Sequence, residues 1–213
     1  MPELIPALLA KSASEAQQKL AAILPLSPIF QLDVMDGQFV PNQTWYDAQA
    51  FATFNSHLHV ELHLMVNDPE RVILDWINTP NLKRVLWHIE IPVDHQVLFD
   101  LCRHHKLECG LALSPKTPVS SLSPFLDQLD EVLLLGVEPG WSGQALIPST
   151  LEKIQAIKQL NSNLLVGFDG GVDEHSIPEL VKKGVDRLYT ASAMFKHADP
   201  AQAFRQLKSL GLY

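Results

Sequence analysis

The stretch EVLLLGVEPGWSGQALIPSTLEKIQAIKQL, residues 131–160, contains one complete strand-loop-helix unit. Its first part, 131–137, is a short apolar run that ends at a loop with glycine and proline, which is typical of a buried strand. Residues 149–160 carry apolar side chains three and four positions apart, and this spacing predicts an amphipathic helix. The loop 138–148 joins the two. The stretch therefore predicts a β-strand followed by an α-helix.

The same alternation runs from one end of the chain to the other. We expect strands at 4–10, 29–35, 60–66, 84–90, 107–113, 131–137, 164–170 and 186–192, and helices at 14–24, 46–54, 68–78, 95–105, 119–129, 149–160, 176–184 and 200–211. Ser14 and Asp68 are expected to cap the first and third helices. Such a series favours an α/β fold, a single (β/α)8 TIM barrel domain over residues 1–213. The alternative is an open doubly wound sheet, but no GxGxxG fingerprint follows the first strand.

The composition and charge of the chain exclude some classes of function. With 46% hydrophobic and 19% charged residues, the chain can bury a large core. A net charge of -8 and a pI near 5.5, without a run of lysines or arginines, argue against nucleic-acid binding. The N-terminus lacks a basic leader and no apolar run approaches the roughly 18 to 20 residues of a membrane span, so we expect a cytoplasmic protein that does not bind membranes. Cys102 and Cys109 lack metal-site spacing and are expected to be buried as small hydrophobic residues.

Polar side chains lie at the ends of several expected strands, where barrel enzymes build their active sites. Period-two alternation puts Gln31, Asp33 and Met35 on the face of the second strand that points into the barrel. His63 lies on the third strand, and Asp169 at the tip of the seventh. Taken singly, these residues suit a buried hydrogen-bond network, a core histidine and an ordinary turn. Their convergence favours a divalent metal site or an acid-base pair.

Three further loops offer backbone N–H groups to an anion. The segments 138–144, 169–172 and 190–195 follow the sixth, seventh and eighth strands and are rich in glycine and small residues. Barrels frequently bind phosphate with the loops after the last two strands. Because the chain is acidic overall, we expect a small anionic ligand to be held by these backbone donors.

The sequence resembles the ribulose-phosphate 3-epimerase family. The resemblance covers nearly the whole chain and lies in LDVMDGQFVPN (32–42), ELHLMV (61–66), DEVLLLGVEPGWSGQALIPSTLEKI (130–154) and FDGGV (168–172). It implies a TIM barrel of the ribulose-phosphate-binding type. It also implies a homo-oligomeric enzyme of the pentose phosphate pathway that acts on a small phosphorylated ketose, interconverting D-ribulose 5-phosphate and D-xylulose 5-phosphate.

The resemblance also implies roles for individual residues. Asp33 and Asp169 would be the catalytic acid-base pair, which inverts C3 through a planar enediolate. With His63, they would hold one divalent metal ion, Zn, Fe, Mn or Co. The residues that would line the pocket are Met35, Met65 and Leu135. The positions that match phosphate-binding residues are Gly140, Trp141, Ser142, Gly143, Gly170, Gly171, Ala191 and Ser192.

The chain departs from the family pattern at the site. Gln31 stands where the family has a histidine as a fourth metal ligand, and a glutamine oxygen suits a harder ion than zinc. Ala10 stands where it has a serine near the substrate, and Leu135 where it has a methionine. Ser142 and Ala191 replace glycines in the phosphate loops. Both keep the backbone N–H, so we expect phosphate binding to survive, provided that neither position requires a positive φ. These changes predict a divergent member.

Two other functions stay open. One is an aldolase or decarboxylase on the same barrel, which would need a lysine at a strand end. Lys11 is the obvious candidate and is better explained as a solvated loop residue. The other is a binding protein that kept the phosphate site and lost efficient turnover. The presence of both Asp33 and Asp169 favours the epimerase.

Overall fold

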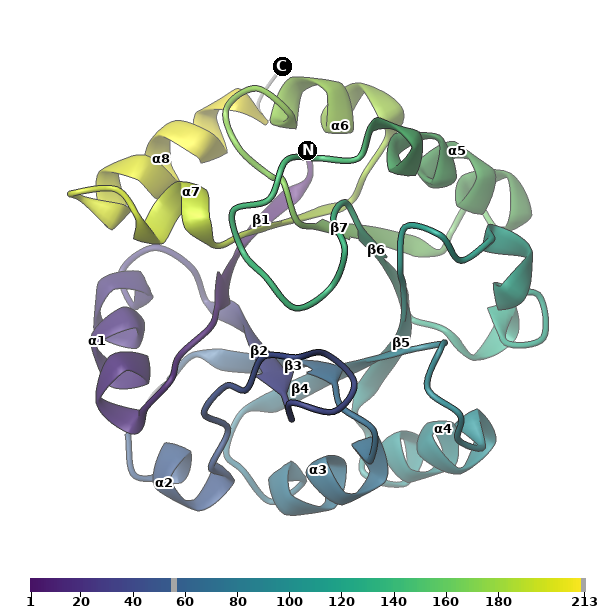
Figure 1. Ribbon diagram of the computed structural model, residues 1–213, viewed down its shortest axis with the longest axis horizontal. Helices are drawn as coiled ribbons and strands as arrows, with labels where there is room; N and C mark the ends of the chain where they lie inside the picture. Colours follow the sequence, from purple (N-terminus) through teal and green to yellow (C-terminus); the bar gives the residue numbers. More distant parts are fainter. Residues whose placement is uncertain (55–56, 212–213) are drawn as a thin grey trace.

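Eight parallel strands close into a barrel in the order of the sequence (Figure 1). The structure is a computed structural model and describes residues 1–54 and 57–211. The strands are β1 Glu3–Leu8, β2 Ile29–Met35, β3 His59–Met65, β4 Leu82–His88, β5 Glu108–Leu113, β6 Glu131–Leu135, β7 Leu165–Asp169 and β8 Arg187–Thr190. The predicted (β/α)8 TIM barrel is therefore confirmed.

Helices surround the barrel (Figure 1). They are α1 Ala13–Ile23, α2 Ala48–Ala52, α3 Pro69–Trp76, α4 His95–His104, α5 Leu151–Leu160, α6 Ile177–Lys183, α7 Ser192–Phe195 and α8 Pro200–Leu210. Asp68 caps α3 as predicted, accepting the N–H of Arg71 at 3.1 Å. The predicted cap at Ser14 is wrong, because extended Ser12 accepts the N–H of Glu15 at 3.2 Å and starts α1 earlier. None of the helices in the described residues has both the length and the apolar character to span a bilayer.

The helix predicted at 119–129 does not form. Two short 3-10 helices, η1 Val119–Leu122 and η2 Leu126–Gln128, take its place. Pro124 lies between them and has no N–H to donate to a continuous helix. The segment still covers the barrel, because Leu122 is fully buried. A third such helix, η3 Pro148–Thr150, leads into α5.

Side chains of alternate strand positions form two separate cores. Phe30, Leu32 and Val34 of β2 pack outside the barrel against the helices. The barrel interior is filled by Ile5, Ala7, Ile29, Leu86, Ala112, Leu133, Leu135 and Tyr189. Cys102 and Cys109 are buried and free, as predicted. This alternation is what directs the polar side chains of β2 and β3 into the barrel.

A buried ion network fills the barrel near the N-terminal ends of the strands. Arg84 of β4 contacts Glu61 of β3, Glu131 of β6 at 3.0 Å and Glu108 of β5 at 2.5 Å. Tyr189 donates its hydroxyl to Glu131 Oε1 at 2.7 Å. Burial, followed by the charge of Glu131, raises the pKa of Glu61 to about 8, although Arg84 opposes the rise. The network closes this end of the barrel with paired charges, so the other end carries the open site.

Candidate active site

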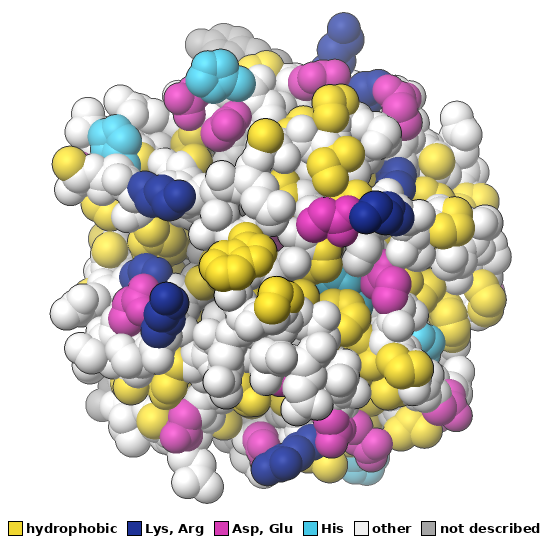
Figure 2. All heavy atoms as spheres, viewed as in Figure 1, with side chains coloured by type: hydrophobic (Ala, Val, Ile, Leu, Met, Phe, Trp, Pro, Cys, Tyr) yellow, Lys and Arg dark blue, Asp and Glu magenta, His cyan; other side chains and the backbone are white. Residues whose placement is uncertain are grey.

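A cavity lies at the C-terminal ends of the strands. The loops after β2 and β6 cross in front of the barrel opening in the view down the barrel (Figure 1). All eight residues predicted to bind phosphate line this cavity, and so do Met35, Met65 and Leu135. Trp141, in the β6 loop, is 60% exposed. On the face seen in Figure 2, lysine and arginine side chains are scattered and form no basic stripe.

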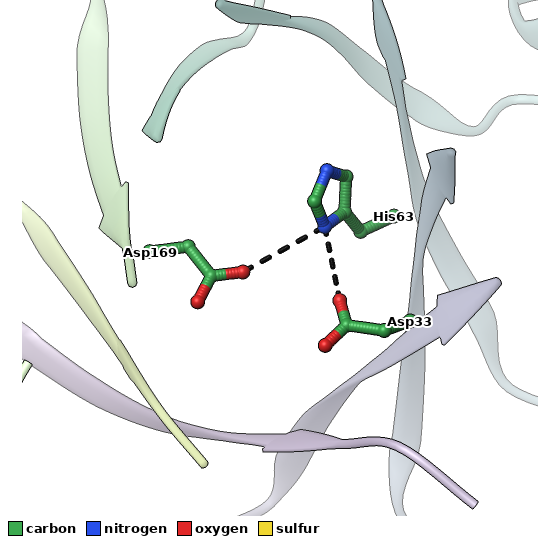
Figure 3. A group of neighbouring side chains, drawn as sticks. All are labelled: Asp33, His63 and Asp169. Atoms are coloured by element: carbon green, nitrogen blue, oxygen red, sulfur yellow. Dashed lines mark hydrogen bonds and ion pairs between the residues drawn. The ribbon is translucent and has the colours of Figure 1, made fainter. Parts of the chain in front are cut away.

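Asp33, His63 and Asp169 converge in this cavity as the sequence predicted. They come from β2, β3 and β7, and the two carboxylates point toward one another with Nδ1 of the imidazole beside them and facing both (Figure 3). His63 Nδ1 lies 2.9 Å from Asp33 Oδ1 and 3.6 Å from Asp169 Oδ2. One ligand atom from each residue lies within 4.8 Å of the others. The three groups could therefore hold a single metal ion.

The electrostatics of the cluster raise the pKa of one carboxyl to near neutral pH. Burial, followed by the charge of Asp33, raises the pKa of Asp169 to about 7, although His63 and a hydrogen bond from Gln31 oppose the rise. Burial lowers the pKa of His63, but the hydrogen bond and charge of Asp33 outweigh it, so that the net shift is upward. A carboxyl that titrates near neutral pH can both accept and deliver a proton.

Gln31 bridges the two carboxylates. Its Nε2 donates to Asp33 Oδ1 at 2.9 Å and to Asp169 Oδ2 at 2.8 Å. Its Oε1 is buried without a hydrogen-bond partner in the described residues. A half-turn of the amide would present that oxygen to the same point, because the two amide atoms are nearly equivalent in shape. Two carboxylates, an imidazole and an amide oxygen form a donor set that fits a divalent cation.

His88 and Glu90 extend the cluster and were missed by the sequence analysis. His88 Nε2 lies 3.1 Å from His63 Nε2, and His88 Nδ1 lies 3.0 Å from Glu90 Oε2. Burial lowers the pKa of His88. Burial opposes ionisation of Glu90, but its hydrogen bonds, first that of His88, outweigh this effect and hold its pKa at about 2. His88 is the last residue of β4, so the rule that singled out Asp169 could also have found it.

The loop after β2 is fixed by Asp36 and Gly37. Asp36 accepts the N–H groups of Gln38 at 2.8 Å, Phe39 at 3.0 Å and Asn67 at 2.8 Å. Gly37 has a φ of +78°, which favours glycine. The next residues of the loop reach the opposite rim, because Asn42 Nδ2 donates to the Gly140 carbonyl.

The departures from the family pattern in the phosphate loops do not strain the backbone. Ala191 has a φ of −118°. Among the non-glycine residues that the structure describes, positive φ occurs at Asn81 and Lys106, not at Ser142. The condition for replacing these two glycines, that neither position needs a positive φ, is therefore met.

The structure does not place Ala10, which follows β1, at the position near the substrate that the family resemblance implied. Leu9 lines the cavity, whereas Ala10 is 1% exposed and belongs to the core outside the barrel. Alternation past the end of the strand turns the two side chains to opposite sides. The alanine at position 10 therefore does not change the cavity wall. Lys11 is exposed and does not line the cavity, as expected for a solvated loop lysine.

Known proteins resemble this chain in sequence and in fold. Residues 3–195 match the sequence profile of the "Ribulose-phosphate 3 epimerase family". The chain is 36% identical over 170 residues to ribulose-phosphate 3-epimerase of Treponema pallidum, covering 77% of each chain. It is 31% identical over 201 residues to that of Aquifex aeolicus, covering 92% of this chain and 90% of the other.

Solved structures at low identity share the barrel. KGPDC from Streptococcus mutans superposes with a TM-score of 0.76 at 12% identity, with 99% of this chain and 97% of the other covered. The 3-hexulose-6-phosphate synthase from Salmonella typhimurium gives 0.73 at 13% identity, with 99% and 98% covered. These likenesses support the fold, and the sequence relatives establish the family. The chain belongs to the ribulose-phosphate 3-epimerase family, whose members are isomerases that act on carbohydrates.

Proposed function

We propose that this protein is a sugar-phosphate 3-epimerase that interconverts D-ribulose 5-phosphate and D-xylulose 5-phosphate. One observation carries the proposal: Asp33 and Asp169 enter one cavity from different sides of the barrel (Figure 3), and the amide of Gln31 bridges them. The shared name of the curated relatives supports the substrate.

The proposed reaction inverts C3 by two proton transfers. The loops after β6, β7 and β8 would hold the phosphate through backbone N–H groups, and this grip orients C3 between the carboxylates. One aspartate removes the C3 proton from one face, and the other delivers a proton to the opposite face of the planar enediolate. Inversion requires two such groups because one carboxylate cannot reach both faces. In the reverse direction, Asp33 and Asp169 exchange roles.

A divalent metal ion fits the donor set of this cavity. Asp33, His63 and Asp169 would hold it, with Gln31 as a fourth ligand, and Zn, Fe, Mn and Co are the candidates. When bound, such an ion supplies Lewis-acid stabilisation of the negative charge that develops on the substrate oxygens. Because Gln31 offers an amide oxygen instead of an imidazole, we expect weaker zinc binding than a second imidazole at this position would give.

Hydrogen exchange at C3 tests the proposal directly. Incubation of the protein with D-ribulose 5-phosphate in deuterated water should place one deuterium at C3 and form D-xylulose 5-phosphate. Mass spectrometry and NMR report both changes in the same sample. A protein that binds the sugar phosphate without exchange would instead be the binding protein that lost turnover. Exchange or cleavage at another carbon would support the aldolase or decarboxylase type.

Lys196 is expected to strengthen phosphate binding. A side-chain carbon added at Gly143 would lie 2.7 Å from Lys196 Nζ, so this ammonium lies beside the β6 loop. Gly143 and Ser192 both line the cavity. No ion pair of Lys196 occurs among the described residues. We expect Lys196→Met to raise the KM for D-ribulose 5-phosphate and the Ki of inorganic phosphate about fivefold to tenfold, with kcat nearly unchanged.

Initial-rate assays with and without inorganic phosphate measure both constants. The matched control is Lys182→Met, because Lys182 is an exposed lysine of α6 that does not line the cavity. Equal constants in the two variants would show that Lys196 does not contact the phosphate.

A further inference from the structure

A chain of hydrogen bonds leads from the cavity to Glu90, in the loop after β4. His63 Nε2 lies 3.1 Å from His88 Nε2, and His88 Nδ1 lies 3.0 Å from Glu90 Oε2. The two histidine rings meet through these nitrogens, with centroids 5.2 Å apart and ring planes 27° from parallel, and Phe39 packs on His88 with centroids 4.8 Å apart. Both histidines are fully buried, so solvent does not supply alternative partners.

Hydrogen bonds to the second carboxylate oxygen of Glu90 fix the position of this side chain. Its Oε1 accepts the backbone N–H of Ser114 at 2.9 Å and the hydroxyl of Thr117. Lys153 fixes that loop by donating to the carbonyls of Ser114 at 3.0 Å and Thr117 at 2.6 Å. Oε1 is therefore occupied by two donors, and Oε2 is the oxygen that faces His88.

The chain has a single consistent direction. An ionised carboxylate only accepts hydrogen bonds, so His88 Nδ1 must carry the hydrogen that Glu90 accepts. In neutral His88, Nε2 then has a lone pair, and the hydrogen between the two rings must come from His63 Nε2. The other ring atom of His63, Nδ1, faces Asp33 and Asp169; without a cation it also carries a hydrogen, which Asp33 accepts, and a bound cation would replace that hydrogen.

We propose that Glu90, acting through His88, is a positioning residue that keeps the hydrogen of His63 on Nε2 and so leaves Nδ1 to bind a divalent cation. The inference rests on the metal site in the proposed function. Partners of metal-ligating histidines commonly fix the ring in this way through the second nitrogen. In this chain the carboxylate acts through an intervening histidine.

Glu90→Gln reverses the direction of the chain. The Ser114 N–H requires an acceptor, so the amide oxygen of the glutamine takes the place of Oε1 and its NH2 group faces His88 Nδ1. His88 then carries its hydrogen on Nε2, and neutral His63 carries its own on Nδ1, where the cation would bind. We expect Mn²⁺ affinity to fall about 10- to 100-fold. Isothermal titration of the chelator-treated protein with Mn²⁺ alone measures it.

A second measurement reads the tautomers themselves. In Glu90→Gln, long-range ¹H–¹⁵N NMR of the metal-free protein should show the hydrogen of His88 on Nε2 instead of Nδ1, and His63 Nε2 without the hydrogen that it carries in the wild type. The matched control is Thr117→Val, which removes one donor to Oε1 but leaves the carboxylate facing His88. We expect wild-type tautomers and a Kd within about twofold. Glu90→Asp keeps an acceptor-only group and should retain the wild-type tautomers.

These outcomes separate the inference from the proposed function. An unchanged histidine pattern and an unchanged Mn²⁺ Kd in Glu90→Gln, with a normal unfolding transition, would overturn the inference. A wild-type protein that binds no divalent cation would also overturn it, whatever its activity. Altered tautomers and weaker Mn²⁺ binding, together with no C3 exchange in the wild type, would support the inference and refute the epimerase.

Discussion

Asp169→Asn is expected to lower kcat for epimerisation by about 10³- to 10⁴-fold, with a KM that changes much less. An amide has nearly the same shape as the carboxyl but cannot accept a proton from C3 or return one. Asp169 lies within the cavity and hydrogen-bonds Gln31 at 2.8 Å, a contact that the substituted side chain can keep through its oxygen. A coupled assay of D-xylulose 5-phosphate formation measures the loss.

Asp33→Asn should cause a comparable loss of kcat. The two variants should differ in hydrogen exchange, and this difference identifies the face of C3 that each aspartate serves. Each retains one carboxylate, so each should still exchange deuterium into a single epimer without inverting it. Which epimer exchanges shows which face each aspartate serves. The control is Asp47→Asn, the same chemical change at the cap of α2, where asparagine caps equally well and activity should be retained. Epimerisation within about tenfold of wild type in both site variants would refute the two-carboxylate scheme.

Much of the fold follows from side-chain periodicity. The period-two pattern at 29–35 placed Gln31, Asp33 and Met35 inside the barrel, because one face of every strand must point inward. Periodicity failed where local backbone chemistry decided the outcome. At 119–129, the apolar spacing suited a helix, but Pro124 interrupted it. At the start of α1, the predicted cap was Ser14, but the extended backbone that a cap requires lies at Ser12.

The site was less predictable than the strands that carry it. Asp33 and Asp169 could be expected together because parallel strands end at the same rim. The contact between His63 and His88 depends on how the neighbouring strands β3 and β4 are aligned, and this pair has a register shift at Val60 and Glu61. Glu90 lies in a loop whose direction no periodicity describes.

Arg84→Met is expected to destabilise the protein by about 3 to 5 kcal/mol. The Arg84 side chain is 1% exposed and pairs with Glu61 and Glu131, whose side chains are both 0% exposed. Methionine keeps most of the volume but leaves buried Glu61 without its cation, while Glu131 keeps Arg187 and the hydroxyl of Tyr189. Burial and Glu131 already raise the pKa of Glu61 to about 8 with Arg84 present, so one carboxyl would have to stay protonated at neutral pH. Urea unfolding at pH 7 measures the free energy lost.

Lys83→Met is the matched control, because Lys83 is the neighbouring residue of β4. Its side chain is 41% exposed and its ammonium lies 3.6 Å from Glu108, so solvent screens the pair and the loss should stay below about 1 kcal/mol. The double variant Glu61→Gln with Arg84→Met should recover part of the stability lost in Arg84→Met, since it removes the carboxyl that has lost its cation. Equal losses in Arg84→Met and Lys83→Met would mean that burial does not strengthen the Arg84 pairs. If the double variant were no more stable than Arg84→Met, the stability lost in Arg84→Met would come from packing and not from charge.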